Sequence, residues 1–366
     1  MGLHFDAAQI QQMAGIPGPW VTILLPPYRK GEPANPDTAR LKTLLRPASD
    51  LGIPEELIAP LRELERNEAL DSGGKGVALF SASGFAAGYR VDSPFSDKLL
   101  FTKYPFIKPL LAEGLAPHEL FALALSRKYM RLFRYAYGAC EEVPFPARVP
   151  TSIEQAMATD QPDHDLVNRS ASGASTGSSF AVRFGTLTDR ESSPEYLHHF
   201  FSIVDRGLHP VTKDRPVLLV GVAEEVAAYR KIATQLNLLD TDNGGGAEYR
   251  SLDEMSKQIR QSALAHYRKE GRAALRNFRE MTNRLRVRQG LAGVLSASEQ
   301  GRIHQVVIAE DIGVPAAHAP QRKDLMENDD LLNTIALETL RTGGQVFVLP
   351  AADMGDAAPV AAILRY

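Results

Sequence analysis

Cysteine is nearly absent from this sequence, with Cys140 the only one among 366 residues. A single thiol excludes an intramolecular disulfide and a thiolate-rich metal site. Glu141 and Glu142 follow directly, and neighbouring carboxylates raise the pKa of a thiol. We therefore expect Cys140 to be an inert structural thiol and not a nucleophile.

Long hydrophobic runs and a strong net charge are lacking as well. No apolar segment reaches membrane-spanning length, and the N-terminal residues lack the cationic stretch and apolar run of a secretory signal. The formal net charge of −3 gives no overall attraction to nucleic acid or membrane, so any such affinity must come from local charge segregation. These absences predict a cytoplasmic protein that does not contact membranes.

The length of the chain predicts two or three domains, because one typical core does not hold 366 residues. We place three domains at 1–115, 116–240 and 241–366. The segment "DTDNGGGAE" near the second boundary lacks the later glutamate of a calcium loop and the lysine of a phosphate loop, so we interpret it as a linker.

Strand and helix patterns alternate along the first two domains. "WVTILLPPY" predicts a buried strand, "DTARLKTLLRPASDLG" a helix, and the runs around Ser83-Gly84 a hairpin. In the second domain, two apolar runs flank a tight turn at Ser126-Arg127-Lys128. A helix starting near Pro194, the strand "RPVLLVGV" and a following helix then predict a mixed or parallel sheet covered by helices.

The third domain is predicted as a compact α/β unit. A long helix runs from about Ser251 to Arg288, and "HQVVIAE", "QVFVLP" and "APVAAILRY" are predicted strands. Gly343-Gly344-Gln345, which matches the catalytic tripeptide of peptide-chain release factors, falls between the helix "DDLLNTIALETLR" and a strand. A glycine after a helix adopts the left-handed conformation that closes it, so we interpret this GGQ as structural.

Four segments, in order, resemble the bacterial branch of the archaeo-eukaryotic release-factor superfamily, whose relatives are the termination factor and Pelota. They are "ILLPPYRKGEPANPDTARLKTLL", "FALALSRKYMRLFRYAYG", "RPVLLVGVAEEVAAYRKI" and "TLRTGGQVFVLP…AAILRY". The resemblance implies an N-terminal α/β domain, a ribonuclease-H-like middle domain and a C-terminal domain like small ribosomal proteins that bind kinked RNA. It also implies a catalytic GGQ loop near residues 168–183, where this sequence has none.

The strongest charge feature is a basic stretch in the third domain, which we call the arginine strip. Its members are Arg268, Arg272, Arg276, Arg279, Arg284, Arg286 and Arg288. The first three are four residues apart and share one helical face, which suits contact with RNA phosphates. A solvated helix face, moderated by Glu270 and Glu280, is the alternative.

Other candidate sites are less specific. Four cations near a helix start, Arg29, Lys30, Arg40 and Lys42, suggest an anion site or plain surface ion pairs. His198 and His199 are adjacent and point about 100° apart on a helix, so with Asp205 they do not predict a metal site. Three loop serines have no general base near them in the sequence: Ser172, Ser175 and Ser178.

We therefore predict a translation-associated factor that binds the ribosome, tRNA or structured RNA, acting in translation rescue or a ribosome-associated stress response, with no metal and no cofactor. Two alternatives remain open. One is a hydrolase of peptidyl-tRNA or RNA that uses the loop at 168–183, and the other is a protein-binding scaffold. A ribonuclease-H-like fold permits hydrolysis without establishing it.

Overall fold

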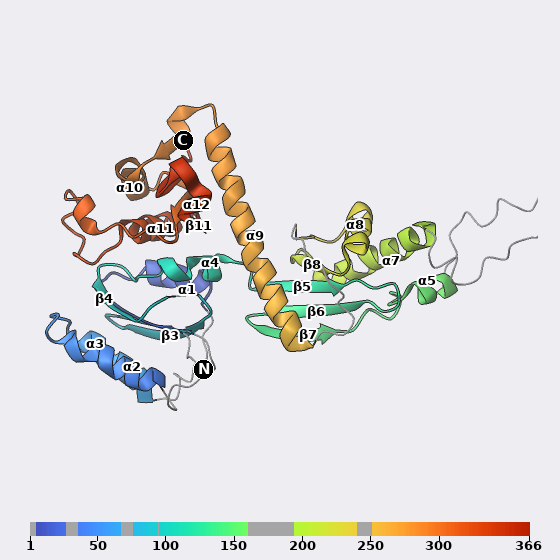
Figure 1. Ribbon diagram of the computed structural model, residues 1–366, viewed down its shortest axis with the longest axis horizontal. Helices are drawn as coiled ribbons and strands as arrows, with labels where there is room; N and C mark the ends of the chain where they lie inside the picture. Colours follow the sequence, from blue (N-terminus) through green and yellow to red (C-terminus); the bar gives the residue numbers. More distant parts are fainter. Residues whose placement is uncertain (1–4, 27–35, 67–75, 94, 160–193, 240–250) are drawn as a thin grey trace, which may run out of the picture. The chain divides into compact units, whose positions relative to one another are not determined.

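The structure, a computed structural model, describes residues 5–26, 36–66, 76–93, 95–159, 194–239 and 251–366 (Figure 1). The chain divides into two compact units. One joins Met1–Ala116 to Tyr267–Tyr366, and the other is Pro117–His266. Within the described ranges, helices accompany three four-stranded sheets, which confirms the predicted mixed α/β class. The three domain boundaries placed from the sequence remain predictions.

The first sheet has the order β3-β2-β1-β4 and is antiparallel throughout. Its strands are β1 (Trp20–Leu25), β2 (Gly76–Ala82), β3 (Phe85–Val91) and β4 (Lys98–Thr102). The helices α2 (Pro36–Leu45) and α3 (Glu55–Arg66) pack on one face through leucines such as Leu41 and Leu61. The helices α1 (Ala7–Ala14) and α4 (Leu111–Leu115) lie on the other side (Figure 1).

The second sheet forms the Pro117–His266 unit, with the order β7-β6-β5-β8. Its strands are β5 (Glu119–Ala124), β6 (Arg131–Ala136), β7 (Ala139–Val143) and β8 (Val217–Val220), of which β5 and β8 are parallel. One face packs against α5 (Ile153–Thr159), α7 (Pro194–Thr212) and α8 (Ala223–Ile232). Met255 and Ile259 at the start of α9 (Leu252–Glu280) pack on the other.

The third sheet has the order β11-β10-β12-β9. Its strands are β9 (Val287–Gln289), β10 (Ile303–Ala309), β11 (Gln345–Leu349) and β12 (Val360–Leu364), and only β10 and β11 are parallel. Its helices are α10 (Leu291–Glu299), α11 (Leu331–Arg341) and α12 (Ala351–Met354). Short 3-10 turns occur at Arg46–Ala48, Lys108–Leu110, Arg284–Arg286, Ala316–His318 and Gly355–Ala357.

The long helix predicted from Ser251 to Arg288 is shorter in the structure, because α9 ends at Glu280. The Asn283 side chain accepts a hydrogen bond from the Leu285 N–H at 3.1 Å and starts a 3-10 turn. The chain then enters β9, which pairs with β12. Arg284, Arg286 and Arg288 therefore do not lie on the helix that carries the other arginines.

The other main elements lie where the sequence patterns predicted them. The hairpin of β2 and β3 turns at Ser83-Gly84, and β5 and β6 flank the predicted Ser126-Arg127-Lys128 turn. No helix in the described ranges is long and apolar enough to cross a membrane. The linker at "DTDNGGGAE" and the loop at 168–183 lie outside the described residues.

Candidate RNA-binding surface

The helix α9, which carries most of the arginine strip, is capped at its start and held by a side chain near its middle. At its start, the Ser251 and Glu254 side chains each accept from the other residue's backbone N–H, at 3.3 and 2.9 Å, which is a capping box. Further along, the Tyr267 hydroxyl donates to Val346 O and accepts from Val348 N, at 3.0 and 3.1 Å. These bonds satisfy the outer edge of β11, so α9 is held along the third sheet.

Three arginines of α9 form ion pairs with carboxylates that come from the chain after strands of the third sheet. These pairs join Arg268 to Glu310 at 3.3 Å, Arg272 to Asp353 at 2.8 Å and Arg279 to Asp356 at 3.5 Å. All three carboxylates follow the carboxyl ends of β10 or β11 in the chain. The charge of these arginines is therefore partly compensated, and they stabilise the packing of α9 as well as presenting cations.

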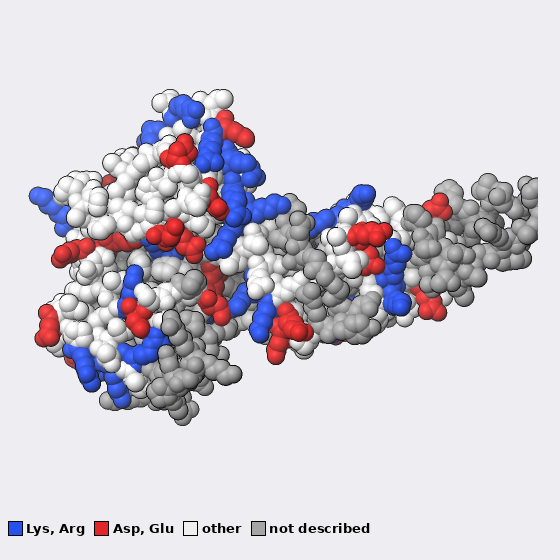
Figure 2. All heavy atoms as spheres, viewed as in Figure 1, with Lys and Arg blue, Asp and Glu red and all other residues white. Residues whose placement is uncertain are grey.

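The positive charges of the other four arginines of the strip are less compensated by carboxylates. Arg286 donates to Leu364 O at 3.1 and 3.2 Å, and Arg288 donates to the carbonyls of Leu285 and Val287. Arg276 and Arg284 are exposed, and among the described residues neither contacts a carboxylate. Figure 2 shows Lys and Arg side chains gathered along α9 beside α12. This surface is suited to phosphate contact.

The candidate anion site near the N-terminus is only partly described. Arg29 and Lys30 lie outside the described residues. Arg40, on α2, donates to Pro26 O at 3.0 Å and pairs with Asp97 at 2.8 Å. Lys42 is exposed on the same helix. Arg40 therefore makes the surface ion pair of the alternative interpretation, and anion binding stays a prediction.

Among the remaining candidates, Asp205 and Cys140 have structural explanations. The Asp205 carboxylate accepts from the backbone N–H groups of Thr234, Gln235 and Leu236 at 2.8 to 3.3 Å, so it anchors the chain after α8. No metal-binding cluster occurs among the residues that the structure describes, including those near His198 and His199. Burial, reinforced by Glu141, raises the pKa of Cys140 to about 11, as expected for an inert thiol. The three loop serines lie outside the described ranges.

The GGQ tripeptide lies at the junction of α11 and β11. Gly343 has a φ of +73°, and its N–H donates to Leu340 O at 3.0 Å. A Cβ on the buried Gly344 would lie 2.6 Å from Thr339 Cγ2 and 2.7 Å from Ile303 O. Gln345 is the first residue of β11. The structural interpretation of the two glycines is confirmed, since each is required by the local geometry.

Gly344→Ala is expected to lower the free energy of unfolding by about 2 kcal/mol, because the added methyl group meets backbone and a packed threonine. Gln345→Ala, at an exposed position, is expected to change it by no more than ~0.5 kcal/mol. Urea denaturation followed by the fluorescence of Trp20, the only tryptophan and fully buried in the same unit, measures both. Equal effects of the two substitutions would contradict the structural role of Gly344.

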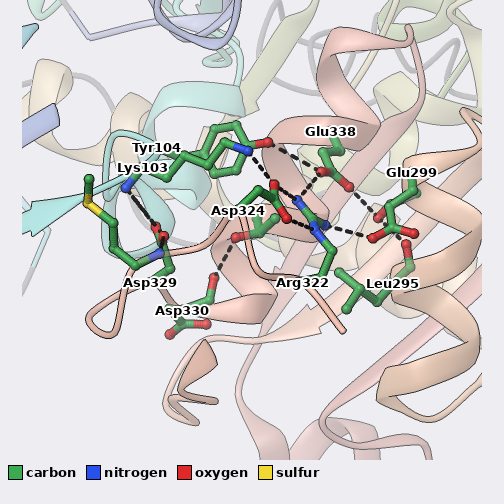
Figure 3. A network of polar contacts seen from close by, with 12 residues as sticks. Lys103, Tyr104, Leu295, Glu299, Arg322, Asp324, Asp329, Asp330 and Glu338 are labelled. Carbon is green, nitrogen blue, oxygen red and sulfur yellow. Dashed lines mark hydrogen bonds and ion pairs between the residues drawn. The ribbon is translucent and has the colours of Figure 1, made fainter. Parts of the chain in front are cut away.

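Sequence reasoning missed a charged network that joins the N-terminal and C-terminal parts of the discontinuous unit (Figure 3). Its centre is Arg322, whose side chain is 10% exposed and pairs with Glu299, Asp324 and Glu338 at 2.9, 2.8 and 3.2 Å. Hydrogen bonds from Arg322 hold the pKa of Asp324 well below its usual range. Lys103, which follows β4, also pairs with Asp324.

A second polar contact joins the same two parts. Asn333 is 2% exposed on α11. Its Oδ1 accepts from the N–H groups of Ile107 and Lys108, and its Nδ2 donates to Pro105 O, all at 2.9 to 3.0 Å. The Lys108 ammonium pairs with Asp330 at 2.6 Å. No local signal predicts these contacts, because the partners are more than 200 residues apart in the chain.

The fold and the surface define a multidomain α/β protein with a long helix that presents arginines. Residues 120–302, half of the chain, match the family described as Bacterial archaeo-eukaryotic release factor family 3. The chain belongs to this family, which confirms the resemblance found in its sequence. The match includes all of the second sheet except Glu119, and it includes α9 and all seven residues of the arginine strip. No curated protein matches the sequence directly.

The solved structures that match this chain have low sequence identity to it. Archaeal translation termination factor aRF1 is 13% identical, with a TM-score of 0.25, covering 98% of this chain and 96% of that one. Archaeoglobus fulgidus Pelota is 11% identical, with a TM-score of 0.40 and coverages of 100% and 94%. S. cerevisiae Dom34 is 12% identical, with a TM-score of 0.33 and coverages of 77% and 74%. Such scores are too low to transfer a function.

Proposed function

We propose that this protein is a release-factor-like protein that binds the ribosome, tRNA or structured RNA, in translation rescue or a ribosome-associated stress response. The observation that carries the proposal is the family match over residues 120–302. The exposed cations of the arginine strip support it, because guanidinium groups bind phosphates through several directed hydrogen bonds. In this proposal the middle domain is ribonuclease-H-like and the C-terminal domain resembles ribosomal proteins that bind kinked RNA.

The proposed protein acts without a GGQ in the middle-domain loop. Residues 168–183 contain no such tripeptide, and the glycines at 343 and 344 hold a helix–strand junction. Hydrolysis of peptidyl-tRNA or RNA through the loop at 168–183, and a role as a protein-binding scaffold, are the alternatives. They are distinguished by a peptidyl-tRNA release assay and by capture of a protein partner in preparations free of nucleic acid.

Co-sedimentation of the intact chain with ribosomes at increasing salt tests the proposal. Binding of the unchanged protein should fall steeply with salt, since phosphate contacts release counterions. The variant Arg276→Glu with Arg284→Glu reverses two exposed cations that contact no carboxylate in the described part of the chain. It is expected to bind on the order of tenfold more weakly and to lower the salt slope by about two.

Arg46→Glu with Arg90→Glu is the matched control, because it makes the same charge change at two exposed positions, on the 3-10 turn after α2 and on β3, that lie far from the strip in the sequence. Its binding should equal that of the unchanged protein. Equal binding by the control and the Arg276/Arg284 variant would show that the arginine strip is not the contact surface. Absence of ribosome binding by the unchanged chain would overturn the proposed function itself.

A further inference from the structure

A second cationic surface lies at the opposite edge of the third sheet from the carboxylates that pair with α9. Here β10 and β11 begin in register, with Gln305 opposite Gln345, and the antiparallel β12 ends beside Ile303. Three segments meet at this edge, and they are Gln300–Gln305, Thr339–Gln345 and Leu364–Tyr366. Together they contain three arginines, one histidine and no aspartate or glutamate.

Two of these arginines are held in place by main-chain oxygens. The Arg365 guanidinium donates to Ile303 O at 3.1 Å and to Thr342 O at the end of α11. Arg302 donates to Tyr366 O at 3.1 Å, and its guanidinium lies 5.5 Å from the centre of the Tyr366 ring. Arg341, in the last turn of α11, is exposed. No Asp or Glu side chain among the described residues pairs with any of the three.

The acidic residues that are nearest to this edge in the sequence form ion pairs with an arginine outside the edge. Glu299 immediately precedes one segment of this edge, and Glu338 immediately precedes another. Both pair with Arg322, at 2.9 and 3.2 Å, and Glu338 also accepts from Ser298 Oγ at 2.8 Å (Figure 3). The network that joins the two parts of the unit therefore also binds the carboxylates that would otherwise neutralise the edge.

The other exposed groups of the edge are hydrogen-bonding groups. Gln305 Nε2 donates to Gln345 Oε1 at 2.7 Å, and Gln345 is exposed. Gly343 is exposed with a φ of +73°, and its missing side chain leaves the backbone open to close approach. Tyr366, 71% exposed, is the only large apolar side chain there that is exposed, within the described residues. A protein partner needs an apolar interface core, whereas RNA needs cations, polar groups and an aromatic face.

We propose that this edge, formed by Arg302, Arg341 and Arg365 with Gln305 and Gln345, is an RNA-binding surface distinct from the helical part of the arginine strip. Its guanidinium groups contact phosphates, and its amide groups and Tyr366 contact exposed bases. The inference rests on the proposed RNA-binding function and adds a location to it. Arg286, which donates to Leu364 O, connects the edge to the 284–288 part of the strip.

The test variant is Arg341→Gln with Gln345→Glu. Glutamate has the shape of glutamine and keeps the oxygen that accepts a hydrogen bond from Gln305 Nε2. Together the two substitutions make the local charge more negative by two. The probes are a labelled single-stranded RNA, a labelled hairpin RNA and poly-glutamate, each titrated at several salt concentrations. We expect RNA binding to weaken on the order of tenfold and its salt slope to fall. Unfolding followed by Trp20 fluorescence should be unchanged.

The matched control is Arg46→Gln with Gln261→Glu, which makes the same charge change at exposed positions elsewhere. RNA affinity equal in the test and control variants would overturn the inference. If the test variant loses poly-glutamate binding but keeps its affinity for both RNAs, the inference is also overturned, and the edge then binds an acidic protein. If the test variant loses RNA binding although the unchanged chain fails to bind ribosomes, the edge stands and the proposed function fails. If the unchanged chain binds ribosomes and the test variant keeps its RNA affinity, the proposed function stands and the inference about the edge fails.

Discussion

Replacing Asn333 by leucine is expected to lower the free energy of unfolding of the discontinuous unit by about 3 kcal/mol or more. Asn333 is 2% exposed, and its amide group satisfies the N–H groups of Ile107 and Lys108 and the carbonyl of Pro105. Leucine has a similar size but cannot form these bonds. Buried backbone groups that lose their partners keep the full cost of leaving water, so the loss exceeds that of one ordinary hydrogen bond.

Urea denaturation followed by Trp20 fluorescence measures this effect, because Trp20 is buried in the same unit. The matched control is Asn277→Leu, the same substitution at an exposed position of α9, where a change within about 0.5 kcal/mol is expected. A second transition that separates residues 5–116 from 267–366 would be consistent with the role of Asn333 as a link. Similar midpoints for the two variants would show that the link contributes little.

The sequence pattern of α11 illustrates what can and cannot be predicted. Its leucines and Ile335 fall on one broad apolar face, and the sequence correctly predicted a helix here followed by a strand. The pattern gives no sign that the polar residues Asn333 and Glu338 on this helix have partners. In the structure both are buried, Asn333 against the chain around Lys108 and Glu338 against Arg322 and Ser298. The spacing of apolar residues indicates only that a helix has a buried face. It does not indicate which polar residues of that helix are buried against a segment that is distant in the sequence.

The arginine strip shows the same limit for charges. The four-residue spacing of Arg268, Arg272 and Arg276 correctly predicted a shared helical face, because that depends only on helix geometry. Glu310 lies just after β10 and Asp353 lies in α12, both distant from α9 in the sequence. The charges near these arginines in the sequence therefore do not reveal which of them form ion pairs. For the same reason the GGQ motif, although correctly interpreted as structural, gave no sign of the cationic edge around it.

The second large effect is expected for the buried ion pair of Lys108 and Asp330. Their side chains are 5% and 11% exposed, and the ammonium lies 2.6 Å from Asp330 Oδ2. Lys108→Met should lower the free energy of unfolding by about 3–5 kcal/mol, because it leaves Asp330 buried without a cation. Asp330→Asn leaves the lysine without an anion but keeps the oxygen that accepts from Leu332 N at the start of α11.

The double variant should be more stable than the sum of the two single effects predicts, because no unpaired charge remains buried. Arg62→Met with Glu55→Gln provides the matched cycle for an ion pair whose side chains are 44% and 62% exposed, where a coupling energy below about 1 kcal/mol is expected. All variants are compared by Trp20 fluorescence in urea. If Lys108→Met costs no more than Arg62→Met, the buried pair does not hold the two parts together. Their cohesion then depends on Asn333, on the Lys103–Asp324 ion pair and on the packing of α1 against α11.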